Sequence, residues 1–439
     1  MTRNTITCVS CLVASIGTSA IAGNDLEPLG PLAETGSYAG QAMDAQGNLL
    51  AIGQKNGAQY AVMFYGHDAE GWQLTQALNI GSRRAVSLAF GDGFIGAALS
   101  GSGSSSGVVL EPNGKSWQVT ADLQNPDPSR FNNFTLAAAS DDAIFIACND
   151  NTQQYRDAVL VYERAVVGWQ HIQTIAPSSA TCTLFAEDID AAGNMLVIGA
   201  TRVLGCSGGN LHGAHVYMRG QDNWDHLETL QYGNSNGKWV ACDGTNVVSW
   251  CSSTNPNSSI DYLRVWTWNG SAFSGGSLIS SGNDWGYDIY FPEGMEINDG
   301  VIAFGMCSGF WGCQTSATTN RSVFTAQRNG SSWNLRSPIP VSIPSGYGSA
   351  GFGRNVVMSG GSILVGAPAY SGNRGVVFSA PLGDVLNCPG DLDGDGTTDG
   401  SDLGLFMAEW GDTGRGDING DAVVDAADLG ILLSMWGDC

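Results

Sequence analysis

Three short sequence elements recur through most of this 439-residue chain. The first is an aromatic residue followed six positions later by an aliphatic residue, and successive aromatics stand 45 to 60 residues apart. It occurs six times, at Trp72/Leu78, Trp117/Leu123, Trp169/Ile175, Trp224/Leu230, Phe273/Ile279 and Trp333/Ile339. Such spacing indicates a repeat architecture, in which each unit buries its apolar face against its neighbours.

The other two elements occur seven times each, in phase with the aromatic. One is a short apolar run rich in small residues, such as Leu50-Ala51-Ile52-Gly53 and Ile363-Leu364-Val365-Gly366. The other follows a Gly/Ser/Asn-rich turn and alternates, as in Val159-Leu160-Val161-Tyr162. Seven units of about four short strands predict a mainly β chain with a seven-bladed β-propeller over residues 23–383. We assign the small-residue runs to inner strands around a crowded central channel, and the aromatics to the wedges between blades.

The seventh unit lacks the aromatic element, because the chain passes from Phe378 through Pro381 into an acidic segment. Leu26-Glu27-Pro28-Leu29 precedes the first unit and can supply the missing outermost strand. Pairing strands from both ends of the chain removes an exposed sheet edge. We therefore expect this closure, and a monomeric propeller.

Phe352-Gly353, followed by Val365-Gly366-Ala367-Pro368, resembles the FG-GAP repeat of integrin α-subunits, and Leu196–Ala200 matches it in part. In that family some blades bind calcium through an Asp-rich loop. The corresponding segments here, Asp44–Asn48 and Asp190–Asn194, hold one carboxylate each. A calcium site needs more oxygen ligands than that, so we interpret both segments as turns.

After the repeats, residues 384–439 form a separate module with a duplicated acidic loop. Its two copies are offset by 26 residues, and oxygen ligands fall at loop positions 1, 3, 5, 9 and 12, with a backbone carbonyl at position 7. The predicted ligands are Asp391, Asp393, Asp395, Thr397, Asp399 and Asp402 in the first loop, and Asp417, Asn419, Asp421, Val423, Asp425 and Asp428 in the second. The pattern predicts two bound calcium ions.

Each loop leads into a short predicted helix with one apolar face. These faces are Leu403, Phe406, Met407 and Trp410, and Leu429, Leu432, Leu433 and Trp436, and we expect them to bury against each other. A loop followed by a helix, Asp at position 12 and tandem duplication resemble a type I dockerin. That resemblance implies a cohesin-like or cell-surface protein partner. Positions 10 and 11, Gly400-Ser401 and Ala426-Ala427, offer such a partner little side chain.

The remaining features indicate export. Arg3, an apolar stretch and Ala20-Ile21-Ala22 predict a signal peptide over residues 1–22 and a secreted or cell-surface protein. A formal net charge of −23 argues against nucleic-acid partners and anionic membranes, and no apolar segment is long enough for membrane insertion.

Cysteine spacing suits local disulfides such as Cys242–Cys251 and Cys307–Cys313, and a Cys388–Cys439 clamp, with one cysteine free. We assign the free thiol to Cys148. The pairing among Cys148, Cys182, Cys206, Cys242, Cys251, Cys307 and Cys313 is left open.

No catalytic constellation is evident. Glu187-Asp188 and the pair Glu293 and Glu296 are carboxylates of the kind that hydrolyse glycosides, but the sequence does not fix their separation. We therefore favour a non-catalytic binding protein, whose propeller presents loops to a glycan or protein. The alternative is a polysaccharide-degrading hydrolase or lyase on a propeller, tethered through its dockerin-like module; convergent acids with raised pKa in the channel would favour it.

The two calcium sites are predicted to differ in affinity. Ala422 stands where the first loop has Gly396, so the second loop must hold an alanine in a strained turn at a cost of about 1 kcal/mol. Calorimetric titration of the calcium-free chain should therefore resolve one tighter and one weaker site. Two sites of equal affinity would contradict this, and Ala422→Gly should bring the two affinities together.

Overall fold

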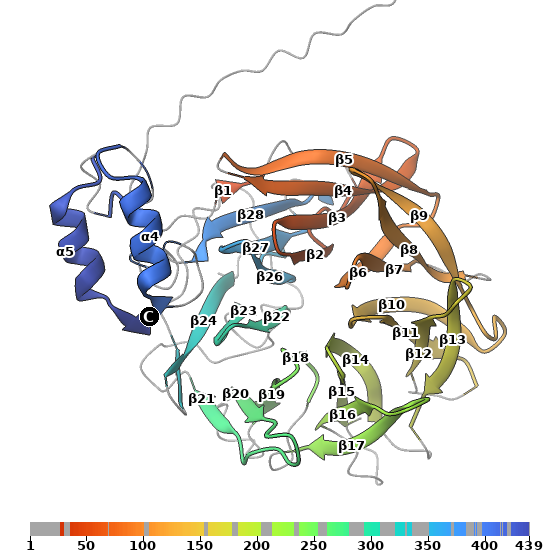
Figure 1. The fold of residues 1–439 in the computed structure, drawn as a ribbon. Helices are drawn as coiled ribbons and strands as arrows, with labels where there is room; N and C mark the ends of the chain where they lie inside the picture. The colour runs from red at the N-terminus through yellow and green to blue at the C-terminus, as the bar shows by residue number, and fades with distance from the viewer. Residues whose placement is uncertain are drawn as a thin grey trace, which may run out of the picture.

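The computed structural model of the chain describes residues 27–29, 36–68, 70–100, 105–152, 157–177, 183–202, 213–231, 237–252, 261–280, 294–307, 321–329, 332–335, 351–369, 373–382, 390, 392, 397–412, 414, 416–418 and 423–438. Within these residues the propeller strands form seven four-stranded antiparallel sheets around a central opening (Figure 1). The mainly β, seven-bladed propeller predicted from the repeats is therefore confirmed. No helix in the described residues is long and apolar enough to cross a membrane.

Each blade runs from its innermost strand outward. Blade 1 is β2 (Ala42–Gln46), β3 (Leu49–Asn56), β4 (Gln59–Asp68) and β5 (Gly71–Gly81). Blade 2 is β6 (Ala85–Gly91), β7 (Phe94–Leu99), β8 (Ser105–Asn113) and β9 (Ser116–Gln124). Blade 3 is β10 (Phe131–Ala139), β11 (Ala143–Asp150), β12 (Asp157–Arg164) and β13 (Trp169–Ile175). Blade 4 is β14 (Thr183–Ala192), β15 (Met195–Arg202), β16 (Gly213–Arg219) and β17 (Trp224–Leu230).

The last three blades follow the same order. Blade 5 is β18 (Val240–Cys242), β19 (Asn246–Ser252), β20 (Asp261–Thr267) and β21 (Ser277–Ser280). Blade 6 is β22 (Met295–Asn298), β23 (Val301–Cys307), β24 (Arg321–Asn329) and β25 (Ser332–Leu335). Blade 7 is β26 (Val356–Ser359), β27 (Ser362–Ala367) and β28 (Val376–Pro381), completed by the N-terminal β1 (Glu27–Pro28).

The ring is closed by strands from both ends of the propeller, as the missing seventh aromatic element predicted. Strand β1 pairs antiparallel with β28, with Glu27 opposite Ser379 and Pro28 opposite Phe378, and the Leu29 amide donates to the Val377 carbonyl at 2.8 Å. Pro28 lacks an amide hydrogen but stands on an outermost strand, where only one edge needs donors. Closure therefore joins residues about 350 positions apart in one sheet.

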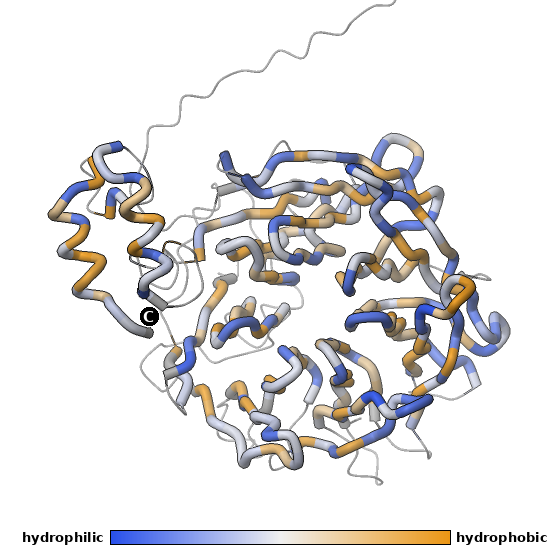
Figure 2. Tube along the Cα trace, viewed as in Figure 1, coloured by the Kyte–Doolittle hydropathy of each residue, from blue (hydrophilic) through white to orange (hydrophobic). Residues whose placement is uncertain are grey.

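The small-residue runs were assigned to the wrong strand. Leu50 to Gly53 and its six counterparts lie in the second strand of each blade, and the innermost strand is the less apolar segment before it. The second strands are buried on both faces, as β7 and β27 show with every residue buried. Figure 2 shows hydrophobic residues inside the blades and frequent hydrophilic residues along the outermost strands. Burial on both faces gives these strands the stronger apolar pattern.

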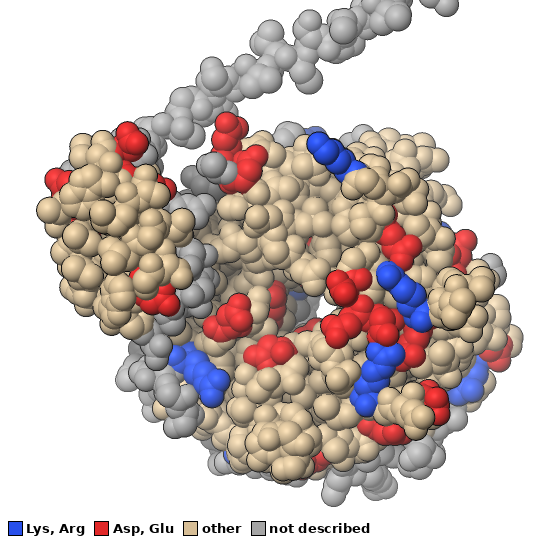
Figure 3. Space-filling view, in the orientation of Figure 1, with Lys and Arg blue, Asp and Glu red and all other residues tan. Residues whose placement is uncertain are grey.

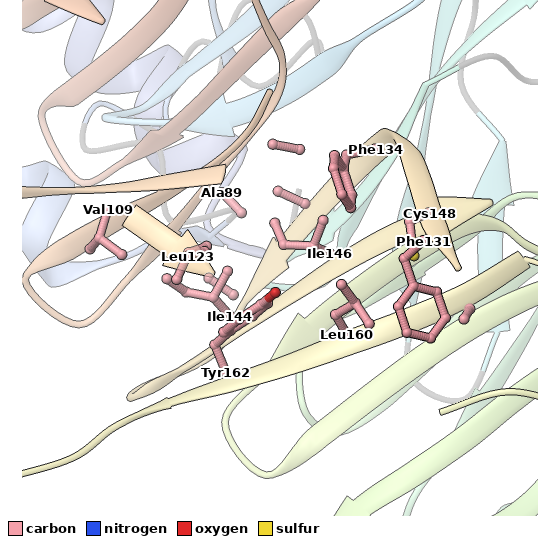
Figure 4. Close-up of a cluster of buried hydrophobic side chains, with 14 of the residues drawn as sticks. Ala89, Val109, Leu123, Phe131, Phe134, Ile144, Ile146, Cys148, Leu160 and Tyr162 are labelled. Atoms are coloured by element: carbon pink, nitrogen blue, oxygen red, sulfur yellow. The ribbon is translucent and has the colours of Figure 1, made fainter. Parts of the chain in front are cut away.

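The repeated aromatics do fill the wedges between neighbouring blades. Trp117 stacks on Phe64 of the preceding blade with ring centroids 5.1 Å apart, and Trp224 meets Phe145 edge-on at 4.8 Å. Figure 4 shows one such interface, between blades 2 and 3, where Phe134, Ile144 and Leu160 lie among apolar neighbours from both blades. Each blade therefore buries its faces against the next, and the repeats share a continuous core.

Glycine pairs bring the blades into backbone contact near the channel. A Cβ at Gly305 in blade 6 would lie 2.0 Å from the Gly353 carbonyl oxygen, just before blade 7, and a Cβ at Gly366 would lie 2.1 Å from the Gly40 oxygen. Gly353 and Gly40 have φ of 77° and 84°, which side chains rarely adopt. Glycine at both partners is thus required by space and by backbone conformation.

The C-terminal module has the two predicted helices, α4 (Gly400–Ala408) and α5 (Ala426–Ser434). Phe406 and Leu432 are completely buried, with Leu392 and Val424, in the module's own core. The prediction of two fully buried faces is wrong in part. The side chains of Met407, Trp410, Leu433 and Trp436 are 55%, 44%, 50% and 49% exposed. Trp410 and Trp436 lie beyond the helix C-caps, Glu409 and Met435, and so do not continue the buried face.

Gly305→Ala should destabilise the propeller by about 2–3 kcal/mol, because the new methyl group meets backbone that cannot move without separating blades 6 and 7. Chemical denaturation followed by tryptophan fluorescence would measure the change. Gly275→Ala is the matched control, since nothing lies within 4 Å of that Cβ position and its φ is ordinary. Equal stability of the two variants would contradict the close contact.

Candidate functional site

The innermost strands border a cavity of about 330 Å³ in the central channel. Four acidic residues line it, Asp44 on β2, Asp188 and Asp190 on β14, and Glu296 on β22, together with Arg354. Figure 3 shows acidic side chains gathered around the central opening on the face in view. The acids come from blades 1, 4 and 6, so the ring brings together residues from three distant parts of the sequence.

Three of these acids occupy the same register position. Asp44 lies opposite Ala51, Asp190 opposite Val197 and Glu296 opposite Ala303, in each case two residues before the end of the pairing with the second strand. Counted from the hairpin turn, which begins three residues later, the same position holds Ala89, Ala241 and Val357 in the blades that follow each of them. An acid in one blade is therefore followed by an apolar residue in the next.

Each acid accepts a hydrogen bond from the backbone of the next blade. The Phe90 amide donates to Asp44 Oδ2 at 2.6 Å, the Cys242 amide to Asp190 Oδ2 at 2.7 Å, and the Met358 amide to Glu296 Oε2 at 2.7 Å. These donors are the residues directly after Ala89, Ala241 and Val357. An innermost strand pairs on one side only, so its other edge leaves amides that need acceptors.

Blade 4 adds a second bond of this kind. The Val240 amide donates to Asp188 Oδ2 at 2.9 Å, two residues before the Cys242 bond. Because alternate residues of a strand point the same way, Asp188 and Asp190 match the two-residue spacing of the outward amides of β18. The side chains thus act as a short substitute for a strand pairing between blades 4 and 5.

The aspartates also accept hydrogen bonds from the backbone beside them. Oδ1 of Asp44 accepts from the Ala45 amide at 2.8 Å, and Oδ1 of Asp190 from the Ala191 amide at 2.8 Å. Asp188 does the same with Ile189 at 3.1 Å. Both oxygens of all three aspartates therefore have backbone donors, which fixes their orientation.

Burial raises the pKa values of these acids. The pKa of Asp44 rises to about 7, because loss of hydration outweighs the Phe90 and Ala45 amide bonds, and Asp190 adds repulsion. The same balance raises the pKa of Asp188 to about 7 and of Asp190 to about 6, and holds that of Glu296 well above its usual range. Their side chains border the channel and keep some exposed surface, yet they lie deep among protein atoms.

The sequence had identified only part of this group. Asp188 and Glu296 were candidate carboxylates, whereas Asp44 and Asp190 were interpreted as turn residues; the turns begin three residues further on. Glu187 does not enter the channel cavity; its Oε1 lies 3.1 Å from Lys238 Nζ, and its Oε2 accepts from the Thr201 hydroxyl. Glu293 lies outside the described residues. The shared pattern Asp-Ala-x-Gly-Asn was the available signal.

In the module, the structure describes seven of the twelve predicted calcium ligands: Thr397, Asp399, Asp402, Asp417, Val423, Asp425 and Asp428. Asp391, Asp393, Asp395, Asn419 and Asp421 lie outside the described residues. Asp399 is the N-cap of α4 and forms a capping box with Asp402; Asp425 and Asp428 do the same for α5. Positions 9 and 12 of each loop are thus held close together at a helix N-terminus.

The two halves of the module are related by the 26-residue offset. Val424 exchanges backbone hydrogen bonds of 2.9 Å with Gly411 and Asp412, which follow α4. In β29 (Thr397–Thr398) and β30 (Gly437–Asp438), Thr398 lies opposite Gly437, which follows α5. Each loop therefore pairs with the chain after the other helix, so neither half is complete alone.

The described residues test two of the predictions made for the cysteines. Cys148 is free and buried, as assigned. The Cys242–Cys251 disulfide is wrong, because Cys242 is also a free thiol: it lies opposite Val247 at the start of a hairpin, and Cys251 lies further along, opposite Tyr262. Cys313, Cys388 and Cys439 lie outside the described residues.

Comparisons with solved structures find similarities of low sequence identity, with TM-scores below 0.5. No protein-family model and no curated protein matches the chain. The β-propeller domain of the Trilobed protease from Pyrococcus furiosus, described as having an open velcro topology, is 8% identical with a TM-score of 0.48, covering 79% of this chain and 96% of that one. A chain of the Mitotic Checkpoint Complex is 13% identical with a TM-score of 0.46, covering 85% and 99%. Kluyvelomyces marxianus Hsv2 is 12% identical with a TM-score of 0.43, covering 76% and 89%.

Asp190→Ala should destabilise the propeller by about 1–3 kcal/mol, because it leaves the buried Cys242 amide without its acceptor. Asp190→Asn keeps a side-chain oxygen and should cost less. Denaturation at pH 5 is the suitable measurement, because the Asp190 carboxyl is then largely protonated and charge contributes little. Equal losses in both variants would contradict a role as amide acceptor.

Proposed function

We propose that the chain is an exported, non-catalytic binding protein, with a propeller that presents a ligand-binding face and a C-terminal module that docks in a calcium-dependent way. The observation that carries the non-catalytic part is the hydrogen bonding of the channel acids. Carboxylates whose oxygens hold backbone amides of the next blade are poorly placed to transfer protons to a substrate.

Two ends of the channel differ in the connections they carry. The turns between first and second strands, such as Gly47-Asn48 and Gly193-Asn194, are two residues long and gather at one end. Because the strands alternate in direction, the second strands end and the innermost strands begin at the other end, and most of the longer connections in the sequence start or finish there. Longer connections on a rigid scaffold are the usual place for recognition. We place the glycan or protein ligand there.

Docking through the module rests on its calcium loops and exposed apolar side chains. Met407 and Trp410 repeat 26 residues later as Leu433 and Trp436, and all four are about half exposed. Aromatic and Met side chains are common in protein interfaces. Because the module has little basic character, a partner such as a cohesin-like or cell-surface protein needs an apolar patch with a basic rim.

A hydrolase or lyase is the second candidate, favoured by the raised pKa values of Asp44 and Asp190 in one cavity. In that case one protonated acid would donate to a glycosidic oxygen. It requires a substrate group to enter the channel and displace amide contacts that hold the blades together.

One experiment with the full chain separates these functions. The protein is incubated with a panel of immobilised and soluble polysaccharides, with calcium or with chelator, and both retention and new reducing ends are measured. We expect retention without turnover, unchanged in Asp190→Asn. Turnover that Asp190→Asn abolishes would establish the enzyme instead. Chelator should unfold the module, detected by proteolysis within residues 388–439, and leave the propeller intact.

A further inference from the structure

The hydrogen bonds of the channel acids form a regular set, because the acids occupy equivalent positions in different blades. They bridge blade 1 to blade 2, blade 4 to blade 5 and blade 6 to blade 7, and each bridge joins the same two register positions. Polar side chains make weaker bridges elsewhere: Asn355 Nδ2 donates to the Met43 carbonyl at 3.1 Å between blades 7 and 1. The charged bridges thus join blades at three of the seven interfaces around the channel.

The bridging acids also interact with one another across the cavity. Asp44 and Asp190 repel each other, and Glu296 is repelled by both, although the three come from different blades. Asp188 and Asp243 add negative charge beside Asp190. Lys238 partly offsets Asp188, and Arg354 lines the same cavity. Acids therefore outnumber the basic groups facing them, and the Cys242 thiol also bonds to Asp190.

We propose that these acids form a pH-responsive clasp, in which protons shared among Asp44, Asp188, Asp190 and Glu296 allow the blades to stay closed, and loss of those protons loosens the three bridged interfaces. When protonated, a carboxyl group still accepts an amide through its carbonyl oxygen, and no repulsion acts across the channel. When all four are ionised, the amide bonds strengthen individually, but four charges lie close together in poorly hydrated surroundings.

The direction in which pH changes the stability of the propeller follows from the raised pKa values of the channel acids. A carboxyl whose pKa is higher in the folded protein than in the unfolded chain adds stability below its unfolded pKa of about 4, and that stability is lost as the pH rises through the folded value. For Asp190 the folded value is about 6, and for Asp44 and Asp188 about 7. The clasp should therefore hold at pH 5 and weaken between pH 5 and pH 8.

The test compares the full chain with Asp44→Asn/Asp190→Asn/Glu296→Gln, which keeps an oxygen acceptor at every bridge and removes the charges. Calcium is kept at a constant saturating concentration, so that the module contributes equally. The melting temperature of the wild-type propeller should fall by several degrees from pH 5 to pH 8. In the triple variant the fall should be at least halved, and at pH 8 the variant should be the more stable protein.

A measurement at the bridges themselves distinguishes the clasp from a general effect of net charge on stability. Hydrogen exchange at the Phe90, Cys242 and Met358 amides, compared between variant and wild type at each pH, should be several-fold slower in the variant at pH 8 and similar at pH 5. The control Asp92→Asn/Asp141→Asn/Asp222→Asn makes the same charge change at exposed turn residues. It should leave these three amides unchanged.

The outcomes are decisive in both directions. An identical pH dependence in wild type and triple variant would overturn the proposal, and so would a control variant that changes the three amides equally. If the triple variant fails to fold, the same comparison is made with Asp44→Asn alone, and hydrogen exchange is measured at the Phe90 amide. Because the readouts are stability and exchange, the result is independent of whether the propeller binds or cleaves a polysaccharide.

Discussion

The unpaired edge of the innermost strands is the constraint on which this propeller depends. Every blade has one strand whose second edge faces the channel, where no further strand can pair with it. Donor residues on these edges such as Cys242 and Met358 are buried, so their amides need acceptors from the protein. Asp44, Asp190 and Glu296 provide them, each from the neighbouring blade. The same bonds that satisfy the backbone therefore also join neighbouring blades.

This arrangement explains why the blades are not equivalent. Blades 1, 4 and 6 carry an acid at the bridging position, and the blades that follow them carry Ala89, Ala241 and Val357. Acids at this position in consecutive blades would place two charges beside each other. Acidic and apolar residues cannot alternate completely around seven blades, so two neighbouring blades must both lack the acid. Blade 3 accordingly has Ala138 at this position, after Ala89 in blade 2. Gly305 and Gly366 also meet Gly353 and Gly40, at the interfaces between blades 6 and 7 and between blades 7 and 1. Both side-chain hydrogen bonds and close backbone contacts thus join neighbouring blades of the ring.

Much of the fold could be predicted from sequence because burial imposes a regular pattern of apolar and aromatic residues on each blade. The second strands are buried on both faces and the Trp residues fill wedges, so their spacing revealed seven blades and the position of the N-terminal strand. The innermost strands gave a weaker signal, because strands such as β10 and β14 mix buried positions with partly exposed ones. The exposure of Trp410 and Trp436 was missed for another reason: helical spacing continued in the sequence after the helix had ended at its C-cap.

The site was harder to predict than the fold because its residues come together only when the ring closes. Asp44 and Glu296 are about 250 positions apart, and nothing local shows that they face one cavity. Raised pKa values there at first suggest catalysis, yet burial is their largest cause, and the hydrogen bonds show that the acids already hold backbone amides. A residue that must hold two blades together is constrained against moving with a substrate. In the proposed function this constraint leaves recognition to the longer connections and not to the bridging acids.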